Sequence, residues 1–523
     1  MSTILPLRDP PQDTGALQRR LAVALPAALA FAYALGHLDW YLGTPLGRVP
    51  VLDERENLDL AAAIAGGTLP PSPFYRAPGY ALVLAGLRTL GVSAGGLFPA
   101  ALLFGVALHA LNAGLVAGVA RRWFGSGAAL AAGLLFALDP VFVHYATQAL
   151  DATLSLSLFL SGLGCLAAAL AAPDRARGWA GAGVSWAAAT LVRPNFLLAW
   201  AVVPFLAAFP GGMRRARGRL LAAALAGALL FAAASAWQWR VSGVAGFLPW
   251  QGAYNLWAAN RPGANGRYYS QQLSLSPALA RSNPARAESI ILYQREAAGQ
   301  PEDIPAMNAH WRRRFLEEIR THPLRWAGLE ARKAYALLNN WEQYNNKTFA
   351  FHKARSPWLR WNPVCWGALL LLGVAGAFRL GSESPRAAAA LAAVAAAVAA
   401  SILLFFVSAR FRLPLAAILA ILAGGALASP AFWRGWSAGR RASLGAALAL
   451  AGLVAFSDYG GVQDRSTFVQ DHVLLARAAF TVGDDATALG EAREALKLQP
   501  WHPDAAVIAE AASAELAKRK AGP

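Results

Sequence analysis

The chain has 523 residues, of which 56% are hydrophobic and only 15% are charged. Soluble domains carry about a quarter charged residues, so this composition excludes an ordinary soluble enzyme and favours a polytopic membrane protein. Lysine and arginine outnumber aspartate and glutamate by 47 to 29, which gives a net charge of +18. Nucleic-acid-binding proteins share such an excess, but here apolar runs of membrane length separate the basic clusters. We therefore expect no nucleic-acid partner.

Apolar runs recur along most of the chain and predict roughly eleven transmembrane helices. Some of them fall short of the ~20 residues that a straight helix needs to cross a bilayer, so their ends are approximate. The runs cover residues 21–38, 96–120, 127–143, 152–172, 179–192, 196–209, 220–237, 364–377, 387–407, 413–427 and 444–456.

Arginines gather in alternate short connections between these runs, and they predict the topology. The clusters lie at residues 121–122, 175–177, 214–217, 379–386 and 434–441. The positive-inside rule places all of them, together with the N-terminus, on the cytoplasmic side without conflict. The segments 39–95 and 240–362 and the C-terminus then lie outside. The Ala, Gly and Arg content fits a bacterial source and therefore an inner-membrane location.

Four parts follow from this organisation. Residues 1–239 form a transmembrane core with the first outer loop (39–95), and residues 240–362 form an outer, periplasmic domain. Residues 363–457 add the C-terminal transmembrane helices, and residues 458–523 form a periplasmic helical tail. Helical patterns at 307–321 and 324–338 indicate that the outer domain is ordered, because a 123-residue connector would otherwise be unusually long.

The tail resembles one tetratricopeptide repeat followed by a solvating helix. Its stretch "GDDATALGEAREALKLQPWHPDAA" has the small residues that let paired helices pack closely. A single repeat cannot form a long solenoid. The tail is either a docking or capping module for a protein partner, or a purely structural element.

The ionisable residues point to chemistry at the outer membrane surface. Solute transporters usually place such residues inside their spans, whereas here the acids and bases lie at the outer ends of the spans. The first outer loop reads "VLDERENLDLAAAIAGGTLPPSPFYRAPGYALVLAGL" and predicts a short helix over 58–64 along the membrane surface. This placement suits a lipid-linked substrate.

Several motifs resemble the polyprenyl-phosphate-sugar-dependent glycosyltransferases of the GT-C superfamily. They are similar to the bacterial family 39-like branch, related to protein O-mannosyltransferases and the lipid A aminoarabinose transferase. The motifs are "RAPGY", "ALDPVFVHYATQALDATLSLSLFLSG", "LVRPNF", "GAYNLWAANRPGANGRYY", "ARKAYALLNNWEQYNN" and "SARFRLPLAAILA". Each is weak alone, but together they tile residues 20–430 in the family's order.

The resemblance implies an all-α polytopic GT-C fold with about eleven transmembrane helices, amphipathic helices in the first outer loop and a mainly helical outer domain. It implies an inverting transfer of a sugar from a polyprenyl-phosphate donor, such as undecaprenyl phosphate, to a glycan, lipid or protein acceptor. A carboxylate then takes the acceptor proton. The resemblance gives Asp53 this role, and Glu54 orients the acceptor or shares the role; the alternative for both is an acid in an interfacial turn.

Fixed cations are needed where the leaving phosphate gains charge. The resemblance gives Arg76, Arg410 and Arg412 this role, and Arg193 and Lys333 are weaker candidates at other outer positions. The alternative for all five is that their side chains extend to lipid head groups without a chemical role.

Two further acids complete the candidate site. Asp151 begins the fourth span, where relatives often keep a second acid that holds acceptor, sugar or a metal ion. Glu342 contacts the acceptor or braces the outer domain, and Asp139 in "ALDP" caps or ends a helix. The sequence has neither HExxH nor a CxxC pair, so a divalent metal cofactor stays open and rests on the Asp53 and Asp151 pair alone.

Three other functions remain alternatives at this point. One is a ligase for lipid-linked oligosaccharides, and another is a transporter or flippase for polyprenyl-linked glycans. The third is a scaffold that acts through its tail. No Walker-type glycine-rich loop occurs, so ATP-driven transport has no support.

Overall fold

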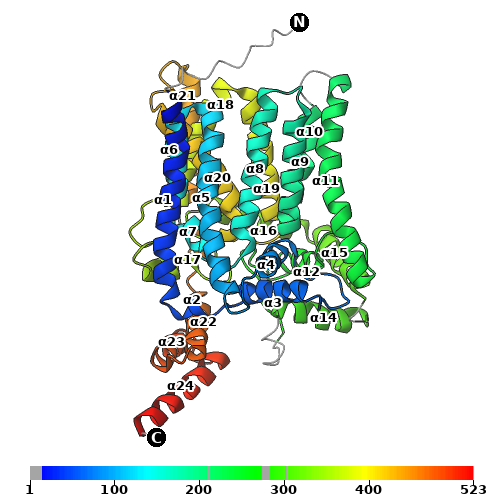
Figure 1. The fold of residues 1–523 in the computed structure, drawn as a ribbon, viewed down its shortest axis with the longest axis vertical. Coiled ribbons are helices and arrows are strands. Elements are labelled where there is room, and N and C mark those ends of the chain that lie inside the picture. Colours follow the sequence, from blue (N-terminus) through cyan, green and yellow to red (C-terminus); the bar gives the residue numbers. More distant parts are fainter. Residues whose placement is uncertain (1–14, 209–212, 274–282, 301–302, 522–523) are drawn as a thin grey trace.

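The computed structural model describes residues 15–208, 213–273, 283–300 and 303–521. These residues form helices joined by loops, and no strand occurs among them. The helices form an upright bundle, with a layer of shorter helices lying across one of its ends (Figure 1). The all-α membrane architecture predicted from the apolar runs is therefore confirmed.

Seven of the described helices are long and apolar enough to cross a membrane. An eighth span is possible if two consecutive helices, which meet at an angle of 59°, are counted together. The seven are α1 (Ala16–Leu42), α5 (Leu97–Phe124), α8 (Asp151–Ala171), α11 (Met213–Ser242), α19 (Pro385–Leu403), α20 (Ala409–Ala428) and α21 (Ala438–Phe456), and the bent pair is α6 (Ser126–Leu138) with α7 (Pro140–Ala146).

Three more helices run beside these spans (Figure 1). They are α9 (Ala176–Val192), α10 (Leu197–Ala208) and α18 (Trp366–Glu383). Each of the eleven predicted apolar runs overlaps a helix. However, α9, α10 and α18 are not both long enough and apolar enough to count as membrane-crossing helices. The count of eleven spans is therefore not confirmed.

The bend between α6 and α7 has a local cause in the sequence. Pro140 is the first residue of α7, and a residue before proline avoids the helical conformation, so Asp139 is extended and the helix ends there. The Asp139 side chain accepts a hydrogen bond from the Val141 amide at 2.8 Å. Asp139 is thus a helix cap, which is the structural role that its position in "ALDP" predicted.

Helix α20 lies deepest in the bundle. In its apolar stretch of 18 residues, 72% is buried inside the protein. The corresponding share for α21, at the edge of the bundle, is 11%. Because α20 contacts α5, α6 and α18, the residues at its outer end are held in a fixed position. Those residues include Arg410.

The shorter helices form one end of the bundle, opposite the first residues of α1, and we call it the outer end (Figure 1). Described helices of the segments 39–95, 240–362 and 458–523 all lie at this end, while the side of the membrane that it faces stays a prediction. The helices of this end are α2 (Pro45–Arg48), α3 (Asp53–Ala65), α4 (Gly79–Thr89), α12 (Gln251–Ala258), α14 (Pro284–Ala297), α15 (Ile304–Thr321), α16 (Pro323–Leu338) and α17 (Phe349–Arg355).

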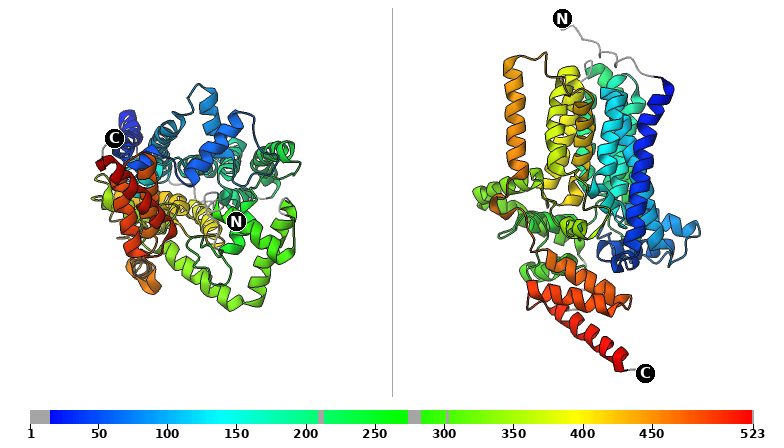
Figure 2. Two further views of the ribbon diagram at one scale, coloured as in Figure 1. Left: turned by 90° about the horizontal axis from the view of Figure 1, so that it is seen from below. Right: turned by 90° about the vertical axis from the view of Figure 1, so that its left-hand side faces the viewer.

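The tail extends from this end, away from the bundle (Figure 2). It consists of α22 (Phe468–Thr481), α23 (Asp485–Leu498) and α24 (Pro503–Ala521). Alanines and a few larger apolar residues form its own small core between the three helices. A helix pair followed by a third helix fits the predicted arrangement, while its identity as a tetratricopeptide repeat stays a prediction.

Gly79 in "RAPGY" lets α4 approach the end of α9 closely. A Cβ atom at this position would lie 2.6 Å from the Leu191 carbonyl oxygen and 3.0 Å from Val192 Cα. Neither atom can move easily because both belong to the backbone. The glycine therefore fixes the spacing between two segments that carry Arg76 and Arg193.

We expect Gly79→Ala to lower the free energy of unfolding by about 1 to 3 kcal/mol, because the added methyl group overpacks this contact. Thermal unfolding of the purified protein in detergent measures the change. Gly86→Ala on the same helix is the matched control, since a Cβ atom there meets nothing within 4 Å. The control should unfold at the same temperature or slightly higher, and equal losses in both variants would contradict the packing argument.

Candidate active site

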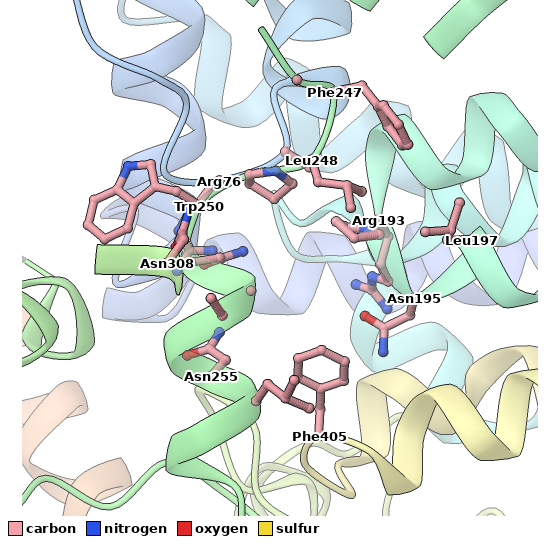
Figure 3. A pocket seen from close by; sticks show the side chains of 18 of the residues that line it. Arg76, Arg193, Asn195, Leu197, Phe247, Leu248, Trp250, Asn255, Asn308 and Phe405 are labelled. Atoms are coloured by element: carbon pink, nitrogen blue, oxygen red, sulfur yellow. The ribbon is translucent and has the colours of Figure 1, made fainter. Parts of the chain in front are cut away.

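A cavity of about 710 Å³ lies at the outer end of the bundle. Its walls come from the loop before α4, the start of α10, the loop before α12, and the helices α12 and α15. Figure 3 shows Arg76, Trp250, Asn255 and Asn308 on one side of it and Arg193 and Asn195 on the other. The volume is in the range of small-molecule binding sites.

The charged residues that line this cavity are mostly cationic. Among the described residues, four arginines and a single aspartate line it, and no lysine, histidine or glutamate does. Most of the remaining lining is apolar and includes Phe247, Leu248, Phe405, Phe406 and Phe411. A cationic end next to apolar walls suits a ligand that carries an anionic group on an apolar chain. The charged lining residues are Arg76, Arg193, Arg312, Arg410 and Asp151.

Three of the arginines and two aspartates form one network. The Arg193 guanidinium binds both carboxylate oxygens of Asp151, with distances of 2.7 Å from Nη2 and 3.0 Å from Nε. Arg410 Nη1 lies 3.0 Å from Asp53 Oδ2 and 3.6 Å from Asp151 Oδ1, so it bridges the two carboxylates. Arg76 donates to the other oxygen of Asp53. The network joins five residues that are far apart in the sequence.

Helix ends position these side chains. Asp53 and Asp151 are the first residues of α3 and α8, where the helix dipole favours a carboxylate. Arg410 lies in the first turn of α20. Arg193 precedes Pro194, which ends α9 and leaves Arg193 in an extended conformation.

Leu52, directly before Asp53, has a left-handed backbone with φ of 50°. Side chains with a Cβ atom rarely adopt this conformation, which costs roughly 1 to 3 kcal/mol. Strained residues of this kind tend to occur where the surrounding structure fixes a functional side chain. Here the strained turn determines how α3 presents its first residue to the arginines.

Arg76 is held between two carboxylates of α3. Asp53 and Glu56 are three residues apart, so they lie on one face of the helix, and both contact the Arg76 guanidinium. Asn283 donates to Glu56 Oε1 at 2.9 Å and accepts from the Tyr75 hydroxyl at 3.2 Å. These contacts connect the outer domain with the first outer loop.

The arginines set the protonation of Asp53. Burial on its own would raise the pKa of this carboxyl, but Arg76 and Arg410 outweigh burial and hold the pKa well below its usual range. For Glu56 burial prevails, and its pKa is raised. Asp53 is therefore ionised, and it cannot accept a proton easily while both arginines contact it.

Glu54 faces away from the cavity into a buried ion pair. Its side chain is 2% exposed, and Lys347 Nζ lies 3.1 Å from Oε1. The amides of Val51 and Ala149 also donate to the carboxylate. Burial alone would lower the pKa of Lys347, but Glu54 and Tyr41 raise it above the ordinary lysine value. Neither Glu54 nor Asp53 is among the residues that line the cavity, but Asp53 contacts two that do, Arg76 and Arg410.

Three other candidates also lie outside the cavity lining. Arg412 donates to the carbonyl oxygens of Leu337 and Asn339 and pairs with Glu342 at 2.5 Å. Lys333 is buried, donates to the Leu403 carbonyl and to Asn260, and pairs with Glu330 at 2.7 Å. Both cations hold helices of the outer end together. The structure brings Asp53, Arg76, Asp151, Arg193 and Arg410 together, and leaves Glu54, Lys333, Arg412 and Glu342 apart from them.

The donor set does not fit a divalent metal ion. In the part of the chain that the structure describes, no group of three or more His, Cys, Asp or Glu side chains has the geometry to hold one. The position between the Asp53 and Asp151 carboxylates is taken by the Arg410 guanidinium.

Sequence reasoning did not identify Glu56, Asn346 or Lys347. The spacing of Glu56 from Asp53 was a usable signal, because residues three apart share a helix face. Asn346 ends the motif "NNWEQYNN" and Lys347 follows it, but their contacts with α3 bring together segments almost 300 residues apart. No local pattern indicates such a pairing.

Residues 76–239 match a family model described as dolichyl-phosphate-mannose-protein mannosyltransferase. The matched segment is less than a third of the chain and includes Arg76, Asp151 and Arg193. It confirms the resemblance to GT-C glycosyltransferases for this part of the chain. No curated protein sequence matches the chain.

Solved structures with a similar arrangement include two of the oligosaccharyltransferase of Archaeoglobus fulgidus. The apo form is 15% identical with a TM-score of 0.47, and AglB in complex with an inhibitory peptide and a dolichol-phosphate is 15% identical with a TM-score of 0.42. Both alignments cover 88% of this chain and 58% of the archaeal chain. Apo ArnT from Cupriavidus metallidurans is 17% identical over 77% of this chain and 78% of its own, with a TM-score of 0.30.

The Glu54 and Lys347 pair gives a test of the site's architecture. We expect Lys347→Met to lower the free energy of unfolding by about 3 to 5 kcal/mol, because it leaves a buried carboxylate without its cation. Chemical or thermal unfolding in detergent measures this. The double variant Glu54→Gln with Lys347→Met should recover most of the loss, since no unpaired charge remains. Wild-type stability of the single variant would show that the pair is not buried as described.

Proposed function

We propose that this chain is a membrane glycosyltransferase of the inner membrane of a bacterium. It takes a sugar from a polyprenyl-phosphate donor, such as undecaprenyl phosphate, and transfers it to a glycan, lipid or protein acceptor on the periplasmic side. The observation that carries the proposal is the cavity with three networked arginines at one end and apolar walls elsewhere. The family match over residues 76–239 supports it.

The arginines bind the donor phosphate. Arg76, Arg193 and Arg410 present their guanidinium groups to the cavity, and Arg410 Nε is buried without a hydrogen-bond partner. Fixed cations of this kind stabilise the negative charge that develops on the phosphate as the glycosidic bond breaks. The phenylalanines near the cavity, including Phe405 and Phe411, receive the first isoprene units of the donor.

The reaction is a single displacement. The oxygen of the acceptor hydroxyl attacks the anomeric carbon, and the bond from this carbon to the phosphate oxygen breaks. The electron pair of that bond leaves with the polyprenyl phosphate. The acceptor proton moves to the Asp53 carboxylate, which acts as the general base. Attack opposite the leaving phosphate inverts the anomeric centre.

Donor binding also activates this base. In the free protein Arg76 and Arg410 keep the pKa of Asp53 well below its usual range. A phosphate that accepts hydrogen bonds from the same two guanidinium groups weakens their hold on the carboxylate, and the pKa rises. Asp53 therefore becomes a competent base only when the donor is in place.

Asp151 orients the arginines and does not accept the proton. Both of its oxygens are bound by Arg193, and Arg410 lies close to it. This pairing fixes the planes of two guanidinium groups toward the cavity. Glu342 is paired with Arg412 and supports the outer end in the same way.

Turnover of a panel of polyprenyl-phosphate sugars by the purified protein tests the proposal. We expect one donor to release free polyprenyl phosphate, and Asp53→Asn to lower the turnover number by about a hundredfold or more, because a general base is lost. Asp59→Asn, an exposed acid of the same helix, is the matched control and should turn over like the wild type.

Each other result has a defined meaning. Full activity of a folded Asp53→Asn variant would show that Asp53 is not the general base, but the transferase function would still stand. Donor binding without turnover, in the presence of a membrane extract that supplies acceptors, would favour a transporter or flippase. Transfer of oligosaccharides in preference to single sugars would favour a ligase.

A further inference from the structure

The loop between α16 and α17 contacts α3 on one side and the C-terminal tail on the other. We propose that Asp471 of the tail holds this loop in place, and that the loop in turn positions the acids of α3. Asp471 is thus a positioning residue for Asp53, and the tail is an internal support of the active site. The inference rests on the proposed function for the role of Asp53.

Two consecutive residues of the loop reach α3. The Asn346 side chain lies beside the Asp53 carboxylate and, after Arg76 and Arg410, helps to lower the pKa of that carboxyl. Lys347 Nζ pairs with Glu54 at 3.1 Å and donates to the Tyr41 hydroxyl at 2.9 Å. Neighbouring residues of the loop thus hold neighbouring acids of the helix. A displacement of the loop would move both contacts together.

Contacts with other segments hold this loop in place. Asn346 has a left-handed backbone with φ of 59°, which is a tolerated but unfavourable conformation for asparagine. At one end of the loop the Gln343 carbonyl accepts from the Ala409 amide at 3.1 Å, directly before Arg410. The loop is therefore connected with the arginine that bridges the two aspartates as well as with α3.

At its other end the tail fixes the loop. Asp471 Oδ1 accepts from the Thr348 amide at 2.8 Å and contacts His352 Nε2 at 3.0 Å. Its side chain is completely buried. The hydroxyl groups of Thr348 and Thr467 lie 2.9 Å apart, which adds a second contact between loop and tail. The Thr348 amide follows directly on Lys347.

Other acids of the tail have different partners. Asp504 is half exposed and pairs with Arg477 within the tail, and Glu494 and Glu515 each pair with a lysine three residues further on. Glu491 contacts Arg355 of α17 at 3.7 Å, which is a more exposed contact. Asp471 thus differs from these acids in being fully buried and in accepting from the backbone of the loop before α17.

Steady-state kinetics of the full chain test the proposal. We expect Asp471→Ala to lower kcat about tenfold, because a buried hydrogen bond to a charged group is lost, while KM for the polyprenyl-phosphate sugar changes less than about twofold. Asp471→Asn should stay within about threefold of the wild type, because its amide oxygen still accepts from the Thr348 amide. Asp504→Ala is the control and should leave kcat unchanged.

A double-mutant cycle distinguishes positioning from general support. Asn346→Ala removes the contact with Asp53 directly, so adding Asp471→Ala to it should cost little more. Multiplicative losses in the double variant would overturn the proposal. Wild-type turnover of Asp471→Ala together with impaired turnover of Asn346→Ala would also overturn it.

Hydrogen exchange keeps this test separate from the proposed function. If the wild type turns over no donor, the transferase proposal fails. The amide exchange rates of residues 53–57 and 343–348 then still test whether the tail positions the loop and α3. Faster exchange of both segments in Asp471→Ala, but not in Asp504→Ala, supports the positioning role. Unchanged exchange in Asp471→Ala overturns it.

Discussion

One guanidinium shared by two carboxylates organises the outer end of this molecule. Arg410 lies between Asp53 and Asp151, and all three are largely withdrawn from water. A charge in such surroundings must be paired, since an unpaired one would be costly. The first turns of α3, α8 and α20 therefore have to converge on one point. The close approach of α4 and α9 also helps to bring Arg76 and Arg193 to this point.

Much of the fold could be predicted from the sequence because the bilayer imposes simple rules. Apolar runs marked the helices, and the arginine clusters placed the outer segments at one end. The residues of the network were named from the family resemblance and not from these rules. The topology adds only that Asp53, Arg76, Asp151, Arg193 and Arg410 all flank helices at the same end of the bundle. Their individual pairing could not be deduced in this way.

The sequence could not separate the residues of the network from others of the same type at the same depth. Glu54 adjoins Asp53, and Arg412 is two residues from Arg410, but each points into a buried pair of its own. On a helix, residues one or two positions apart face different directions, and which direction meets the cavity depends on tertiary packing. The partner of Glu54 is Lys347, from a loop whose course depends on the tail. The number of spans could not be predicted either, because α9, α10 and α18 lie beside the spans without having their length and apolar composition.

The arginine end of the cavity has a kinetic consequence. In a transfer from a polyprenyl-phosphate donor, the sugar departs but the phosphate and its isoprenoid chain remain, and they make the same contacts with Arg76, Arg193 and Arg410 as before. The spent carrier gains a negative charge when the sugar leaves, so it is bound at least as firmly as the donor. Under the proposed function we therefore expect dissociation of the carrier lipid, rather than the chemical step, to limit turnover, and accumulated carrier to inhibit the reaction.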